Sequence, residues 1–237
     1  MKATLAPGFM IVALLLATAS FGSEPVKTYV PTKHYVVTNL VGWTVRVNRT
    51  LLAEEQELGS NALTLLVTKL RDITNAIPPR ACGKLQTIPI WLGLADGHAP
   101  CAEYHPSRAW LQENGFNPDK AKAVEIGNAK RFLSWSKSQP SMVLHELAHG
   151  YHQQVLGYNY EPIKAAYKAA VAKGQYESVK RNNGKTERAY ALNNDQEYFA
   201  EVTEAFFGTN DFYPFIRQEL KEHDPGIYSV LENVWMR

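Results

Sequence analysis

The segment His145-Glu146-Leu147-Ala148-His149 contains the residue types that metal-dependent hydrolysis requires. On a helix, side chains four positions apart lie on one face, so His145 and His149 can direct ring nitrogens at a single ion. Imidazole nitrogen binds Zn²⁺ at about 2.0–2.1 Å. Glu146 flanks the same face and can reach a water molecule at the metal without becoming a ligand. The pattern therefore predicts a zinc site with Glu146 as the general base.

A zinc site of this kind needs a third protein ligand. The extended pattern H-E-x-x-H-x-x-G-x-x-H does not apply, because His152 and Val155 stand where it requires Gly and His. A later segment instead offers three carboxylates at helical spacing beside aromatic residues that indicate burial: Glu197, Glu201 and Glu204. The residues alone leave two simpler explanations open. The histidines can belong to an ordinary amphipathic helix, and the carboxylates can form a solvated helix face.

Together, His145-Glu-x-x-His149 and Glu197-Tyr-Phe-Ala-Glu201 resemble the zincin metallopeptidases of the Glu-ligand class, the gluzincins. Residues 120 to 208 are similar to the catalytic domain of anthrax lethal factor, and flanking segments resemble secreted bacterial-type proteins with the same core. The resemblance implies one zinc ion per chain, bound by His145, His149 and Glu197. It also implies that Glu201 accepts a hydrogen bond from a ligand imidazole, and that Tyr190 helps to polarise the substrate carbonyl.

The activity implied by this resemblance is hydrolysis of a bond in a peptide or protein substrate. Zinc lowers the pKa of a bound water toward ~7, Glu146 accepts its proton, and zinc and Tyr190 stabilise the developing oxyanion. A second class of function stays open, a zincin-fold protein that binds zinc and a partner with little or no turnover. The presence of Glu146 argues against that class, because a structural zinc site needs no general base. A third reading is a binding domain in which the motif is accidental.

The surrounding pattern favours an α+β fold, with strands mainly in the first half of the chain and helices in the second. By the resemblance, this is a zincin-like metallopeptidase domain, in which a small mixed sheet accompanies the motif helix and a second, Glu-bearing helix. We expect helices at 51–77, 140–156, 162–173, 195–207, 212–222 and 226–236. Strands or hairpins are expected at 35–47, 86–92 and 122–126, and a hairpin with Asn183-Gly184 at its turn. The segment 122–126 is the candidate edge strand for pairing with an extended peptide.

The first residues predict export. Lys2, the apolar run from Phe9 to Ala17 and the Ala17-x-Ala19 end are typical of a secretory signal peptide over residues 1–19. The run is shorter than the roughly 18 residues of a membrane anchor, and no second apolar span follows. We therefore expect a secreted or periplasmic protein without stable membrane insertion after cleavage, formed by a single domain over residues 20–237.

The composition of the chain limits its binding partners and the kind of metal site it can form. A formal net charge of +2 gives no electrostatic footprint for nucleic-acid binding, and no pattern indicates an oligomeric state. Two cysteines cannot make a four-thiolate zinc site. In an exported protein they predict a disulfide between Cys82 and Cys101, since neither thiol has another partner. Asn48-Arg49-Thr50 is a glycosylation sequon, which matters only in a eukaryotic host.

Overall fold

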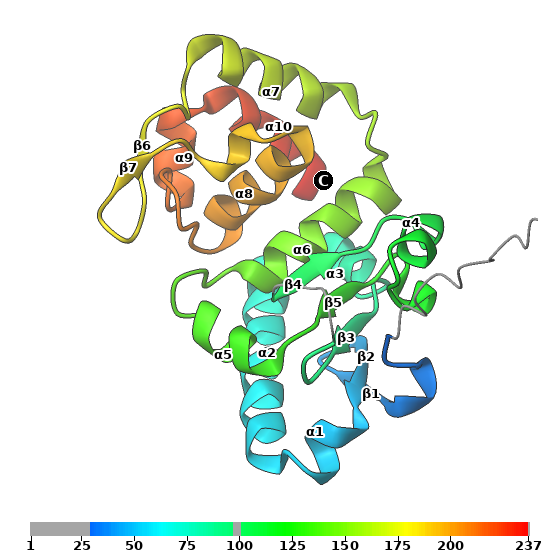
Figure 1. Cartoon of the computed structure of the whole chain (residues 1–237). Coiled ribbons are helices and arrows are strands. Elements are labelled where there is room, and N and C mark those ends of the chain that lie inside the picture. Colours follow the sequence, from blue (N-terminus) through cyan, green and yellow to red (C-terminus); the bar gives the residue numbers. More distant parts are fainter. Residues whose placement is uncertain (1–28, 97–100, 237) are drawn as a thin grey trace, which may run out of the picture.

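A computed structural model describes residues 29–96 and 101–236 of the chain. The predicted signal peptide, residues 1–19, lies outside the described residues. Within the described ranges, no helix has both the length and the apolar character needed to cross a membrane. Figure 1 shows a sheet with flanking helices on one side of the central helix α6, and a group of helices on its other side.

The main sheet has five short strands in the order β1-β2-β3-β5-β4. The pairs β1–β2 and β4–β5 are antiparallel, whereas β2–β3 and β3–β5 are parallel, so the sheet is mixed. Val41 and Gly42 turn the first hairpin with positive φ angles of 53° and 92°. The strands are β1 (Tyr35–Leu40), β2 (Trp43–Asn48), β3 (Ile90–Leu92), β4 (Ala102–Tyr104) and β5 (Val124–Ile126).

The predicted edge strand is in the wrong place. Residues 124–126 do form a strand, but β5 lies between β3 and β4, and the edge beside the motif helix is β4. Strand β4 has only three residues and lies in a loop-rich stretch, so it shows no alternation that a sequence pattern could reveal. Any peptide that adds to this edge of the sheet must pair with β4.

Ten helices accompany the strands in the described part of the chain. The expected helix at 51–77 is divided into α1 and α2, and the one at 195–207 has the expected bounds. A small hairpin of β6 (Val179–Lys180) and β7 (Thr186–Glu187) forms around Asn183-Gly184, as expected. The helices are α1 (Arg49–Ala53), α2 (Gln56–Ala76), α3 (Pro79–Leu85), α4 (Arg108–Glu113), α5 (Ala129–Trp135), α6 (Met142–Tyr151), α7 (Glu161–Lys173), α8 (Asp195–Phe207), α9 (Arg217–His223) and α10 (Pro225–Trp235). The expected α+β architecture with a small mixed sheet is confirmed.

Helix α6 packs against both halves of the molecule, with α2, α3, β4 and β5 on one side and α8 on the other. Its close approach to the sheet side requires Gly150, because a Cβ there would lie 2.6 Å from Ile88 Cδ1. The expected helix to residue 156 continues past Tyr151 only as a π-helical turn, His152–Leu156, which ends before Gly157 with φ 80°. The burial of α6 on most sides fixes the direction of its polar side chains.

The predicted disulfide is wrong, because Cys82 and Cys101 are both free and buried in separate surroundings. Cys82 Sγ lies 4.0 Å from Thr74 Oγ1, whereas Cys101 Sγ lies 3.4 Å from Met142 Sδ. Each thiol packs as a small apolar group, which a buried cysteine does readily. The sequence argument assumed that two cysteines in an exported chain must pair.

The side chain of the sequon asparagine, Asn48, is buried and hydrogen-bonded within the fold. Asn48 is 5% exposed, and its side-chain oxygen accepts a hydrogen bond from the Thr50 amide at the start of α1. Its amide group lies 3.4 Å from Asp96 Oδ1. A glycan on this nitrogen is incompatible with that packing.

Candidate metal centre

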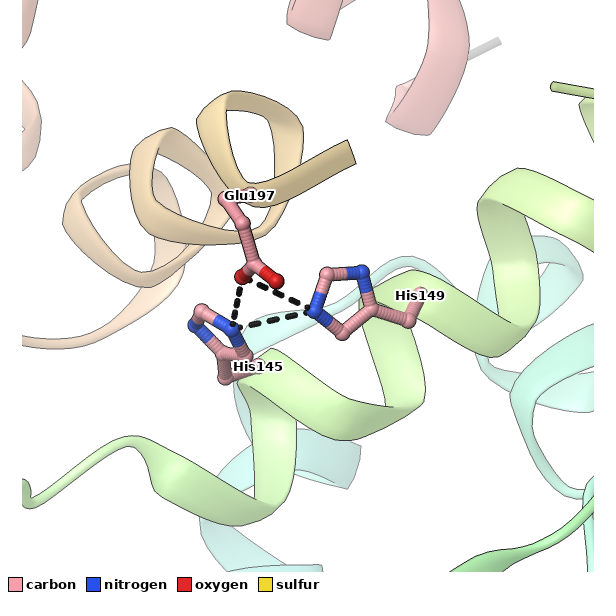
Figure 2. A group of neighbouring side chains, drawn as sticks. All are labelled: His145, His149 and Glu197. Carbon is pink, nitrogen blue, oxygen red and sulfur yellow. Dashed lines mark hydrogen bonds and ion pairs between the residues drawn. The ribbon is translucent and has the colours of Figure 1, made fainter. Parts of the chain in front are cut away.

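Helices α6 and α8 bring His145, His149 and Glu197 together (Figure 2). The Nε2 atoms of the two histidines are 3.1 Å apart, and Glu197 Oε2 lies 3.1 Å from the first and 3.2 Å from the second. The one-face spacing on α6 explains the histidine pair. Asn194 caps α8 by accepting a hydrogen bond from the Glu197 amide, which places Glu197 in the first turn of α8.

The three atoms fit a zinc ion. Ligands at about 2.0–2.1 Å in tetrahedral geometry are about 3.3 Å apart, close to the observed triangle. Two facing imidazole nitrogens and a carboxylate oxygen repel one another at these distances unless a proton or a metal ion lies between them. Burial opposes a charge on His145, but hydrogen bonds to Glu197 and Glu204 raise its pKa well above the usual value. The surroundings therefore favour a positive charge at this point.

The carboxylate behind His145 comes from Glu204 rather than from Glu201. Glu204 Oε1 accepts a hydrogen bond from His145 Nδ1 at 2.7 Å, while Glu201 Oε1 lies 4.0 Å from the same nitrogen. The resemblance had implied this role for Glu201. A neutral ring with its proton on Nδ1 keeps the Nε2 lone pair directed at the centre of the triangle, so Glu204 fixes the tautomer that a metal ligand needs.

Glu146 lines the cavity beside the triangle and lies next to the edge strand. Its Oε2 accepts a hydrogen bond from the Tyr104 amide of β4 at 2.8 Å. Tyr104 is in turn held by its hydroxyl, which bonds to Gln153 at 2.5 Å and accepts from Gln154 Nε2 at 3.0 Å. The carboxylate is therefore positioned by the edge of the sheet, a contact that the sequence pattern did not indicate.

Tyr190 lies on a short 3₁₀ turn before α8 and lines the same cavity. Its ring centroid is 6.4 Å from that of His145, and the residue is 47% exposed. Burial of the hydroxyl and the nearby Glu197 carboxylate raise its pKa, so the group stays protonated and can donate a hydrogen bond. The role in polarising the substrate carbonyl, which the resemblance implied for Tyr190, stays a prediction.

His152 is not part of the triangle, in agreement with the failure of the extended motif. It is completely buried in the π-helical turn, between the rings of Tyr158 and Phe199. Neither ring nitrogen has a hydrogen-bond partner among the described residues. Burial, assisted by His149, lowers its pKa to about 4, so the ring packs as a neutral aromatic group.

Beside the triangle is a cavity of about 510 Å³, lined by residues of α6, α8, β4 and the loops near β6 and α9. One wall holds Arg181, which directly follows β6 in the hairpin. Its Nε and Nη2 bind Asp211 Oδ2 at 3.1 and 2.9 Å, and its Nη1 binds Glu187 at 3.2 Å. No short-range spacing connects Arg181 with Asp211, so this pair could not be found from the sequence.

A second group of potential ligand atoms consists of Glu103, His105 and Glu125 on the sheet side. Here an internal cation is present: Lys120 binds Glu125, and its Nζ lies 3.2 Å from Asp96 Oδ2. His105 Nε2 lies 2.6 Å from Glu125 Oε2. We call Asp96, Glu103, His105, Lys120 and Glu125 the lysine cluster. It does not fit a metal ion as well as the triangle does, because the lysine ammonium already supplies a positive charge to Glu125 and Asp96.

The α+β fold with its small sheet and the convergent triad fit a metallopeptidase domain. Residues 124–236 match the family model described as glucose-regulated metallo-peptidase M90. The match covers just under half of the chain, runs from β5 to α10, and includes all three residues of the triad. No curated protein and no solved structure matches the chain. The similarity to this family supports a metallopeptidase, which implies a metal cofactor and a peptide or protein substrate.

Proposed function

We propose that this protein is a zinc-dependent metallopeptidase of the gluzincin type, with His145, His149 and Glu197 as the zinc ligands. The observation that carries the proposal is the triangle of donor atoms at 3.1–3.2 Å, formed by two helices that are far apart in sequence. Nitrogen and carboxylate donors in a three-ligand set leave a fourth position for water or substrate, as in catalytic zinc sites. The match to the metallopeptidase family supports the same conclusion.

Zinc would supply a Lewis acid for the substrate carbonyl and lower the pKa of a water molecule. The residues of the chain would then have separate tasks. Glu146 accepts the proton of the attacking water and returns it to the leaving amine. The Tyr104 amide holds this carboxylate at the edge of β4. Tyr190, which lines the same cavity, would donate a hydrogen bond from its hydroxyl to the developing oxyanion.

We also propose that the protein acts after export, since residues 1–19 have the pattern of a signal peptide. The alternative is a zinc-binding protein that turns over little or no substrate. It shares the triad but gives no reason for Glu146 to be held within the cavity by a backbone hydrogen bond. The two alternatives differ in whether Glu146 matters for hydrolysis.

The test measures zinc content and peptide cleavage for the wild type and for Glu146→Gln. We expect about one zinc per chain in both proteins, with cleavage of a peptide mixture by the wild type only. Gln is isosteric with Glu but cannot act as a base, so the cleavage rate should fall at least about a hundredfold. Equal cleavage by both proteins would exclude Glu146 as the base. No zinc in the wild type after metal-replete purification would overturn the proposal.

A further inference from the structure

The cavity beside the metal centre has an excess of acidic groups. Its volume is about 510 Å³, and its described lining contains six carboxyl groups but only one arginine. The acidic residues are Glu103, Glu146, Glu197, Glu201, Glu204 and Asp211. Such carboxylates can still be neutralised by positively charged groups of the same chain.

Most of these carboxyl groups have a partner or a task. Glu197 belongs to the triad, and Glu204 accepts the hydrogen bond of His145 Nδ1. Asp211 binds Arg181 through two nitrogens, at 2.9 and 3.1 Å. The arginine is also bound to Glu187, so its charge is not available to a further carboxylate in the cavity.

Glu103 Oε1 lies 3.7 Å from His105 Nε2, which leaves Glu201 as the exception. Glu201 is 4% exposed, and its nearest basic atom, His145 Nδ1 at 4.0 Å, already donates to Glu204. Its Oε2 has no hydrogen-bond partner within the part of the chain that the structure describes. A hydrogen bond from the side chain of Asn210 reaches the same carboxyl group, but it brings no positive charge. A buried carboxylate without a cation costs free energy. The lining of the cavity therefore contains a carboxyl group that lacks a cation.

We propose that this cavity binds the cationic side chain of a lysine or arginine of the substrate, near the bond to be cleaved, with Glu201 as its partner. The proposal rests on the peptidase function proposed above and specifies the substrate class. Met142, Phe212 and Trp135 supply apolar wall for the alkyl part of such a side chain. A charge-assisted hydrogen bond at a buried carboxylate is stronger than a neutral one, so charge at this position determines selectivity.

Binding measurements test this independently of turnover. The zinc-loaded Glu146→Gln protein is titrated with fluorescent peptides Ala-Ala-Xaa-Ala-Ala, blocked at both ends, in which Xaa is lysine, norleucine or glutamate. We expect the lysine peptide to bind about 10–100-fold more tightly than the norleucine peptide, and the glutamate peptide to bind most weakly. Norleucine keeps the alkyl chain and removes only the charge.

Two further variants separate the pocket from general acidity. Adding Glu201→Gln should reduce the preference for lysine over norleucine to within about twofold, with zinc content unchanged. Adding Glu222→Gln, which removes one charge from the exposed helix α9, should leave the preference intact. Zinc content is measured for each protein to show that the triad is undisturbed.

Equal binding of the lysine and norleucine peptides would overturn the inference, as would a preference that survives Glu201→Gln. Absence of detectable binding of the lysine peptide would also overturn it. Different results would contradict the proposed function, namely the absence of zinc or the absence of cleavage that depends on Glu146. Selective binding of lysine without cleavage would thus support the pocket and contradict the peptidase, whereas cleavage without selectivity would do the reverse.

Discussion

Among the described residues, two buried clusters contain a histidine that is hydrogen-bonded to a glutamate, and they differ in the source of positive charge. In the metal centre, His145 Nδ1 lies 2.7 Å from Glu204, and the other ring nitrogen faces His149 and Glu197. In the lysine cluster, His105 Nε2 lies 2.6 Å from Glu125, and the Lys120 ammonium lies between Glu125 and Asp96.

This difference distinguishes a stabilising cluster from a binding site. Lys120 balances buried carboxylates within the chain and also lies 5.5 and 5.7 Å from the ring centroids of Tyr35 and Trp91. The metal centre has comparable carboxylates but no lysine or arginine directed at its triad among the described residues. A buried site with surplus negative charge gains free energy from an external cation, whereas a balanced one does not.

The largest expected effect is loss of the metal on Glu197→Gln. Removing the anionic ligand should weaken zinc binding at least about a thousandfold, ~4 kcal/mol, and should abolish cleavage. Zinc should also no longer raise the melting temperature, since a ligand stabilises only the state that binds it. Calorimetric zinc titration and thermal unfolding with and without chelator measure both effects. If instead Glu125→Gln removed the zinc and Glu197→Gln did not, the roles of the two clusters would be exchanged.

Lys120→Met should give the next largest effect, on stability rather than on metal binding. The change keeps most of the apolar stem and leaves buried Glu125 and Asp96 without their cation, which should lower the free energy of unfolding by about 3–5 kcal/mol. Zinc affinity of the folded protein should stay within about twofold, because the triad lies elsewhere. Urea unfolding of the zinc-free protein measures the first quantity, and Lys168→Met on the exposed side of α7 is the control. A stability equal to that of the control would show that Lys120 is not the balancing charge.

Glu204→Gln should weaken zinc binding by about 10–100-fold without abolishing it. The substitution replaces the charged acceptor behind His145 with a neutral one, and partners of this kind usually contribute that much to metal affinity. Glu201→Gln should have a smaller effect, since Glu201 lies 4.0 Å from the same nitrogen. Competition with a zinc chelator compares the two variants directly. The reverse order would assign the hydrogen bond to Glu201, as the sequence resemblance had implied.

The structure places Glu204, and not Glu201, behind His145, and this difference shows what the sequence could and could not predict about the site. The histidine spacing and the Glu197 stripe follow from helical periodicity, because residues three or four apart share a face. Periodicity places Glu197, Glu201 and Glu204 on related faces of α8, but it cannot say which carboxylate meets His145. That depends on how α6 crosses α8, which is set by packing across the whole core.

The same reasoning applies to the fold. Long periodic segments such as α8 were predicted with their correct bounds, whereas the three-residue strand β4 was not predicted at all. The lysine cluster was missed because Lys120 comes from a 3₁₀ turn, and its partners lie in β5 and in the loop after β3. Contacts between irregular segments leave no repeat in the sequence, and the free thiols of Cys82 and Cys101 depend on packing in the same way.

The smallest effect concerns the pH dependence of stability within the lysine cluster, where two glutamates should behave oppositely. Burial opposes ionisation of Glu125, but its hydrogen bond from His105 and its ion pair with Lys120 hold its pKa below the usual 4.5. Its contribution to stability is therefore present above pH 4.5 and is lost as the pH falls through the lower pKa of the folded state. Burial raises the pKa of Glu103, so its contribution is present below pH 4.5 and is lost as the pH rises.

Urea unfolding of the zinc-free protein between pH 3 and pH 7 should separate the two glutamates. The stability deficit of Glu125→Gln relative to the wild type should shrink as the pH falls, because protonation removes the same charge from the wild type. The Glu103→Gln protein should gain stability relative to the wild type as the pH rises. The reason is that burial disfavours ionisation of the Glu103 carboxyl group, whereas Gln does not ionise. Parallel curves for both variants would show that Lys120 does not distinguish the two carboxylates, and the contrast between a balanced cluster and a site that needs an external cation would lose its basis.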